Sequence, residues 1–121
     1  MENKNLINLA FITRLEKKIP KKNIVIVTKN QPIEAIKEAI KNNMLTIGES
    51  KIQEAEKKFL RNPIRKKIEL HLIGHLQSNK TKKAVQLFDV IQSADSIKII
   101  KKINNEAQKI KKQQRIFLQI N

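Results

Sequence analysis

The chain contains no cysteine, tryptophan or tyrosine, and only two glycines and three prolines among its 121 residues. Without cysteine there is no disulfide framework and no thiolate chemistry. Two glycines are too few for a glycine-rich phosphate loop, and no stretch approaches the roughly 20 apolar residues of a membrane span. The first residues show no apolar signal region followed by a cleavage site, so we expect a mature, untargeted chain in the cytoplasm.

The charge is strongly one-sided. There are 26 basic against 11 acidic residues, and the net charge of +15 by itself favours a polyanionic partner. However, 22 of the basic residues are lysine and the four aromatic residues are all phenylalanine, whereas nucleic-acid readers use arginine and stacking aromatics. With 21 isoleucines and 12 asparagines, this composition indicates drift toward AT-rich codons. We expect a solvated basic surface, including Lys111 and Lys112, and keep nucleic-acid binding as the lesser alternative.

Apolar patterns along the chain alternate between the helical and the strand period. A first helix is predicted over residues 2–18, with Leu6, Leu9, Ala10 and Thr13 on one side and Pro20 after it. Strands are predicted at 24–28, 44–47, 68–73, 90–93 and 115–120. The helices between them begin at Pro32, at about 51, at 79 after Ser78, and after Asp95 or Ser96. This strict alternation predicts one α/β domain over residues 1–121, with a parallel sheet and helices outside it.

One lysine stands at the end of the first predicted strand. The run Ile24–Thr28 is apolar and free of charge, and Lys29 closes it. Lysine forms an imine with an aldehyde once its amine is neutral, and partial burial favours the neutral amine. Because parallel strands gather their carboxyl ends at one edge, where α/β folds bind ligands, we expect Lys29 at such a site. The alternative is a lysine that simply extends into solvent.

Other strand ends carry polar residues or glycine. Ser50 with Gln53 matches a helix capping box, and this ordinary role is the favoured interpretation of Ser50. Gly74 allows either a tight turn or a close approach to a ligand, the turn being commoner. His71 and His75 would lie on one strand face but about 13 Å apart, too far to share one ion, so no metal site is expected.

Five short runs, taken in order, resemble the signatures of the pyridoxal phosphate homeostasis protein family. They are VTK at 27–29 with Pro32, IGESKIQE at 47–54, HLIGHLQSNK at 71–80, SADS at 93–96 and LQIN at 118–121. The second run departs from the family pattern, since Ile47 replaces an aromatic residue, Ser50 an asparagine and Lys51 a tyrosine. The resemblance covers nearly the whole chain.

The resemblance implies a partial (βα)8 TIM-type barrel like the N-terminal domain of alanine racemase, with about five parallel strands after an N-terminal helix. It implies binding of pyridoxal 5′-phosphate through an imine to Lys29, with weaker contributions from Ser50, Gly74, His75 and Asn121. It also implies a role in cofactor homeostasis without established catalysis. A racemase-like enzyme is the alternative, although a second acid/base group opposite Lys29 is needed and the chain has no tyrosine.

The family's chain is about twice as long, and the segment that usually holds the cofactor phosphate lies in the missing half. A complete barrel needs eight strands, so five leave two open edges and an uncovered inner face. We therefore expect truncated, impaired binding. Three explanations stay open: a second polypeptide completes the barrel, the chain self-associates, or it is a non-functional remnant.

Overall fold

The computed structural model describes residues 6–120. Within that range the helices are α1 (Leu9–Glu16), α2 (Ile33–Lys41), α3 (Ile52–Phe59), α4 (Thr81–Leu87) and α5 (Ile97–Lys109). The strands are β1 (Ile26–Val27), β2 (Thr46–Glu49), β3 (Glu69–Leu72), β4 (Val90–Ala94) and β5 (Arg115–Leu118). Short 3₁₀ turns are η1 (Lys21–Asn23), η2 (Pro63–Lys67) and η3 (Ser78–Lys80).

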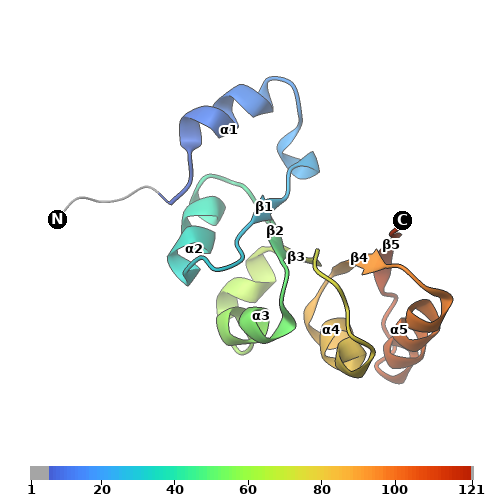
Figure 1. The fold of residues 1–121 in the computed structure, drawn as a ribbon. Helices are drawn as coiled ribbons and strands as arrows, with labels where there is room; N and C mark the ends of the chain where they lie inside the picture. The colour runs from blue at the N-terminus through green and yellow to red at the C-terminus, as the bar shows by residue number, and fades with distance from the viewer. Residues whose placement is uncertain (1–5, 121) are drawn as a thin grey trace.

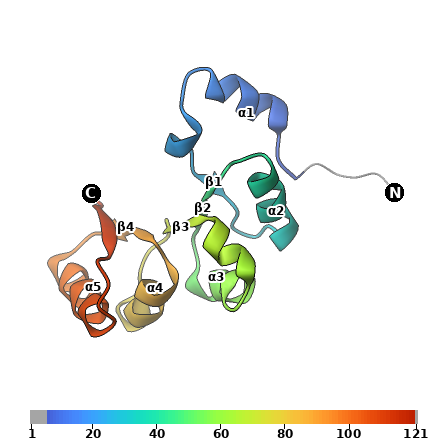
Figure 2. The same cartoon turned by 180° about the vertical axis from the view of Figure 1, so that it is seen from behind.

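The five strands form one parallel sheet in the order β1-β2-β3-β4-β5. In the views of Figures 1 and 2, α2 to α5 follow one another along one side of the strands, while α1 lies near β1 on the other side of the picture from α3, α4 and α5. The predicted α/β fold with parallel strands and outer helices is confirmed. Since neighbouring strands are consecutive in sequence, β1 and β5 are the edges of the sheet.

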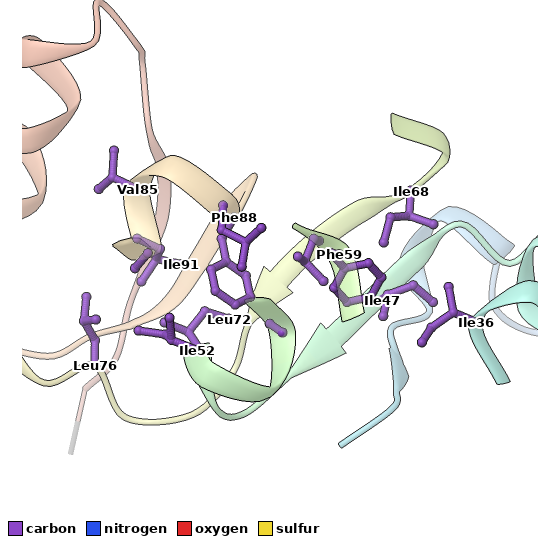
Figure 3. Packing of buried hydrophobic residues seen from close by; sticks show 14 of the residues in the cluster. Ile36, Ile47, Ile52, Phe59, Ile68, Leu72, Leu76, Val85, Phe88 and Ile91 are labelled. Atoms are coloured by element: carbon purple, nitrogen blue, oxygen red, sulfur yellow. The ribbon is translucent and has the colours of Figure 1, made fainter. Parts of the chain in front are cut away.

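The core lies between the sheet and the helices that follow its strands. Figure 3 shows the ring of Phe59 near Ile47 and Ile68, with Phe88 nearer Ile91. These residues come from helix α3, from strands β2 and β4, and from the segments that follow η2 and α4. Members with 1% exposure or less include Ile36, Ile47, Phe59, Leu70, Leu72, Val85, Phe88 and Ile91. No helix among residues 6–120 is long and apolar enough to cross a bilayer.

The first helix is shorter than predicted. It begins at Leu9 because the Asn8 side chain accepts a hydrogen bond from the Phe11 N–H at 3.0 Å, the geometry of an N-cap. Ile12 is its buried residue, whereas Leu9 and Phe11 are exposed, so the expected apolar stripe was wrong. Residues 2–5 of the predicted helix lie outside the described part of the chain.

The second strand begins two residues later than predicted, because Met44 is part of the C-terminal cap that follows α2. Asn43 adopts a left-handed φ of 60°, and the Met44 N–H donates to the Ala39 carbonyl at 2.8 Å. This is the Schellman pattern, in which the residue after the left-handed cap packs back on the helix. Met44 is accordingly buried. The expected left-handed cap at Asn42-Asn43 is confirmed.

Helix capping by serine was predicted correctly at one of three places. The Ser96 side chain accepts from the Ile99 N–H at 3.2 Å and begins α5. Ser50 makes no such bond, because Lys51 is the N-cap of α3. Ser78 does not cap α4, because it is the first residue of the 3₁₀ turn η3 and Lys80 occupies the N-cap position of α4. The predicted stripe of α5 was also partly wrong: Ile97 is 72% exposed.

Some of the basic residues have structural partners, contrary to the prediction for Lys112. Its ammonium donates to the Phe88 carbonyl at 2.7 Å and also to the Val85 carbonyl, and burial lowers its pKa. The Arg65 guanidinium donates to the Leu87 carbonyl at 2.7 Å and contacts Asp89 at 2.9 Å. Two cations thus satisfy the carbonyls at the end of α4, where an ordinary helix leaves them unpaired.

A buried cation ties β1, β2 and α3 together. The Lys58 ammonium donates to Glu49 Oε1 at 2.6 Å, to the Thr28 carbonyl at 2.7 Å and to Glu54 Oε1 at 2.9 Å. Glu49 is fully buried, and the Thr28 hydroxyl donates to its second oxygen at 3.0 Å. Burial raises the pKa of Glu49 despite these donors. Burial also opposes ionisation of Glu54, but hydrogen bonds from Lys58 and the Asn30 N–H lower the pKa of Glu54 overall.

Replacing Lys58 with methionine should destabilise the fold by about 3–5 kcal/mol near pH 7, because Glu49 is left buried without its cation. The deficit should shrink as the pH falls toward 4.5, the ordinary carboxyl value. A carboxyl group whose pKa is raised in the folded state destabilises the protein once the pH rises above the ordinary pKa of the group. Lowering the pH therefore reduces the stability deficit of the variant. Lys58→Met also removes an interaction that lowers the pKa of Glu54, and the stability lost in this way likewise becomes smaller as the pH falls. Chemical denaturation at two pH values measures the difference.

The matched control is Lys57→Met, which removes an exposed lysine from the same helix. It should change stability by no more than about 0.5 kcal/mol. A deficit for Lys58→Met that is the same near pH 5 as near pH 7 would contradict the buried-pair explanation.

Candidate functional site

Lys29 lies immediately beyond the carboxyl end of β1, in a tight turn. The Gln31 N–H donates to the Thr28 carbonyl at 3.0 Å, and Asn30 takes a left-handed φ of 61°. Asparagine tolerates this conformation better than most residues. Lys29 itself is exposed, so the expected partly buried setting was wrong. The amine is accessible at the carboxyl-terminal end of the strands, where the prediction located it.

The residues on both sides of Lys29 are held by groups from β2 and α3. Thr28 is 2% exposed, and its N–H donates to the Gly48 carbonyl at 3.0 Å. Its carbonyl accepts from Lys58, as described above. On the other side, the Asn30 N–H donates to Glu54 Oε1 at 2.5 Å. The backbone that carries Lys29 is therefore fixed at its two flanking residues.

A hollow of about 450 Å³ lies at the carboxyl ends of β2 and β3. Three of the predicted site residues, Ser50, Gly74 and His75, line it. Lys51, Gln77 and Lys80 add polar and cationic groups to the lining. Lys29 is not among the lining residues, so the described chain brings three predicted residues together and leaves the lysine outside this hollow.

Gly74 is required by the backbone that passes beside it. A Cβ atom at this position would lie 2.1 Å from the Ser50 carbonyl oxygen, which is main chain and cannot rotate away. The two segments that follow β2 and β3 therefore approach each other as closely as the missing side chain allows. Close backbone packing accounts for this glycine, rather than the turn that the sequence favoured.

His75 follows β3, and its side chain approaches Asp95, the residue after β4. Its Nδ1 lies 3.9 Å from Asp95 Oδ2, and the histidine side chain is 71% exposed. Asn121, the remaining predicted site residue, lies outside the described residues. Among residues 6–120 no group of three or more acidic or histidine side chains is arranged to hold a metal ion.

The second histidine belongs to a polar network on the face of the sheet opposite the helices. His71 is buried, with Nε2 2.8 Å from Glu69 Oε1 and Nδ1 2.9 Å from the Gln92 amide nitrogen. Arg115 donates to the same Glu69 oxygen at 3.1 Å. The Phe117 ring meets the imidazole edge to face at 6.2 Å. The imidazole is thus occupied by structural partners.

The residues that sequence reasoning missed are Glu49, Glu54 and Lys58 around the turn. One signal was present, because Glu54 and Lys58 are four residues apart on a helix, the spacing of a stabilising pair. The third residue, Glu49 on β2, gave no such signal. The contact of Glu49 with Lys58 depends on the packing of α3 on β2, which the spacing of residues does not specify.

The curated relatives and the solved structures that resemble this chain point to the same family. No model of a protein family matches the chain. The pyridoxal phosphate homeostasis protein of Pasteurella multocida is 36% identical over 101 residues, which are 81% of this chain and 42% of that protein. That of Haemophilus influenzae is 34% identical over 125 residues, 98% of this chain and 52% of that protein.

Among solved structures, PipY of Synechococcus elongatus with PLP bound is similar with a TM-score of 0.75 and 32% identity, over 87% of this chain and 50% of that chain. PipY without PLP gives a TM-score of 0.76 and 31% identity. The chain spans about half the length of the curated relatives it matches. On sequence and fold together, it belongs to the family of pyridoxal phosphate homeostasis proteins and corresponds to their N-terminal half.

Proposed function

We propose that this chain binds pyridoxal 5′-phosphate covalently at Lys29, as part of a protein that stores or delivers the cofactor. The observation that carries the proposal is an exposed lysine amine at the carboxyl end of the first strand of a parallel sheet. Ligands of α/β barrels bind at that edge. The family membership and the PLP-bound neighbour support the choice of cofactor.

The residues present fit a pyridine aldehyde better than they fit a phosphate. The Lys29 amine is open to a ligand, and Ser50, Gly74 and His75 form a hollow nearby along the same edge. The buried Ser93 hydroxyl at the end of β4 has no hydrogen-bond partner among the described residues. With two glycines in the chain, the sequence offers no glycine-rich loop for the phosphate. We expect weak binding by this chain alone.

The chemistry asked of the chain is modest. The Lys29 amine must lose its proton, add to the aldehyde carbon and release water. The bound cofactor would supply an electron sink for amino-acid chemistry. A racemase also needs a second acid or base on the far side of the substrate, and the chain has no tyrosine for that role. We therefore propose binding without turnover, and D/L interconversion of an amino acid that depends on Lys29 would contradict it.

We also propose that residues 1–121 form one incomplete barrel domain that a second polypeptide completes. A groove of about 540 Å³ runs beside α5 and β5. Its apolar lining residues are Ile100, Ile103, Ala107 and Ile116, and the rest of its lining is polar or charged. Next to it the edge strand leaves Phe117 49% and Leu118 64% exposed. In a (βα)8 barrel the next strand and helix cover these positions. The occupant we propose is a polypeptide carrying the remaining βα units.

For the covalent site, mix the chain with pyridoxal phosphate, reduce with borohydride and map the modified lysines by mass spectrometry. We expect labelling of Lys29 in clear excess over Lys37, an exposed lysine on α2. Lys29→Ala should remove most of the imine absorbance, while Lys37→Ala should leave it nearly unchanged. Equal labelling of the two lysines would show that Lys29 has no special role.

For the second polypeptide, co-express the chain with the C-terminal half of the Pasteurella multocida relative. We expect the two to co-purify and the pair to bind pyridoxal phosphate more tightly, because the missing strands cover the apolar edge. Leu118→Asp should weaken the pairing by at least about tenfold, since it buries a charge in the contact. Leu60→Asp, at an exposed leucine after α3, is the control.

Failure to pair, with Leu118→Asp no different from Leu60→Asp, would contradict the completed barrel. A chain that neither pairs nor labels at Lys29 would instead be a non-functional remnant.

A further inference from the structure

The turn that carries Lys29 is held on both sides by one cluster of charged side chains. The carbonyl before it, on Thr28, accepts from the Lys58 ammonium at 2.7 Å. The N–H after it, on Asn30, donates to Glu54 Oε1 at 2.5 Å. Lys58 and Glu54 contact each other at 2.9 Å, so a single ion pair on α3 grips the turn at both ends.

The hydrogen-bonding capacity of Lys58 is completely used. An ammonium has three N–H donors, and its three acceptors here are Glu49, Glu54 and the Thr28 carbonyl. The Lys58 side chain is only 11% exposed. Charge-assisted hydrogen bonds of this length in a nearly dry site are stronger and more directional than neutral ones. The position of the Thr28 carbonyl is therefore set by α3 and β2 as well as by its own strand.

Packing alone does not explain this arrangement. Glu49 is completely buried and its pKa is raised by burial, so its presence costs stability that an apolar residue would not cost. A salt bridge made only to hold α3 on the sheet would not need to reach the backbone of Thr28 and Asn30. What the cluster adds is a fixed main chain directly under an exposed, flexible lysine.

We propose that Lys58 is a positioning residue for Lys29, acting together with Glu49 and Glu54. By holding the main chain on each side of Lys29, it restricts where the amine can reach and favours attack on an aldehyde bound at the sheet edge. The inference rests on the proposed covalent site at Lys29. It assigns a role to three residues that do not touch the cofactor.

The test compares variants by the ratio of Lys29 to Lys37 labelling with pyridoxal phosphate and borohydride, measured within the same molecules. Glu54→Ala removes the acceptor of the Asn30 N–H but keeps the buried Glu49–Lys58 pair, so the variant should stay folded. We expect its labelling ratio to fall roughly threefold to tenfold, the effect of losing one charge-assisted hydrogen bond. Glu56→Ala, on the same helix and in contact with Lys83, should leave the ratio unchanged.

Two further readouts separate positioning from general stability. Amide hydrogen exchange at Asn30 should quicken in Glu54→Ala while exchange in β3 and β4 stays slow. Lys58→Met should lower the ratio at least about tenfold, and Lys58→Arg, which keeps the charge and several donors, should restore part of it. The ratio is read only below the melting temperature of each variant.

The outcomes separate the two proposals. If the unmodified chain labels Lys29 no more than Lys37, the covalent site itself is wrong. If the unmodified chain favours Lys29 and the folded Glu54→Ala and Lys58→Met variants favour it equally, the site stands and the positioning role is overturned.

Discussion

The ammonium of Lys58 is the constraint on which the functional end of this molecule depends. It joins Thr28 after β1 to β2 and α3 through three short contacts, and Lys29, the lysine of the first family run, follows directly after Thr28. A charge in that position is stable only because two carboxylates and a carbonyl surround it. Burial makes the charge of Glu49 costly to the folded state, and the contacts that offset this cost also hold the main chain of the turn after β1.

Around that point the rest of the structure is ordinary parallel α/β packing. Apolar side chains of the strands pack against the helices, and Leu70 and Leu72 belong to the same core cluster as Phe59 and Phe88. Lys112 and Arg65 donate hydrogen bonds to the carbonyls at the end of α4. The departure from the ordinary lies at β5, where large apolar side chains stay exposed. An open edge of this kind is a liability that natural proteins cover, and this is the physical reason to look for a second polypeptide.

The strand order, the helix positions and the edge that carries Lys29 were predictable, because they follow from apolar period and from the ordered motifs. The errors have local causes. Met44 read as a strand residue but completes the Schellman turn of α2; Ser50 and Ser78 read as caps although other residues begin those helices. Lys112 read as solvated but donates to carbonyls 24 and 27 residues earlier. Contacts over such separations have no periodic trace in the sequence. The contact of Glu49 with Lys58, nine residues apart on a strand and a helix, has none either.

The cluster around Lys58 draws all its members from the first two βα units, β1–α2 and β2–α3. Its members are Thr28, Asn30, Glu49, Glu54 and Lys58. During synthesis the N-terminal units of a chain leave the ribosome first. The nascent chain therefore already contains every residue that holds the turn carrying Lys29 before β4 and β5 are translated. Shortening the gene from its 3′ end would remove the later strands without disturbing the geometry of that turn.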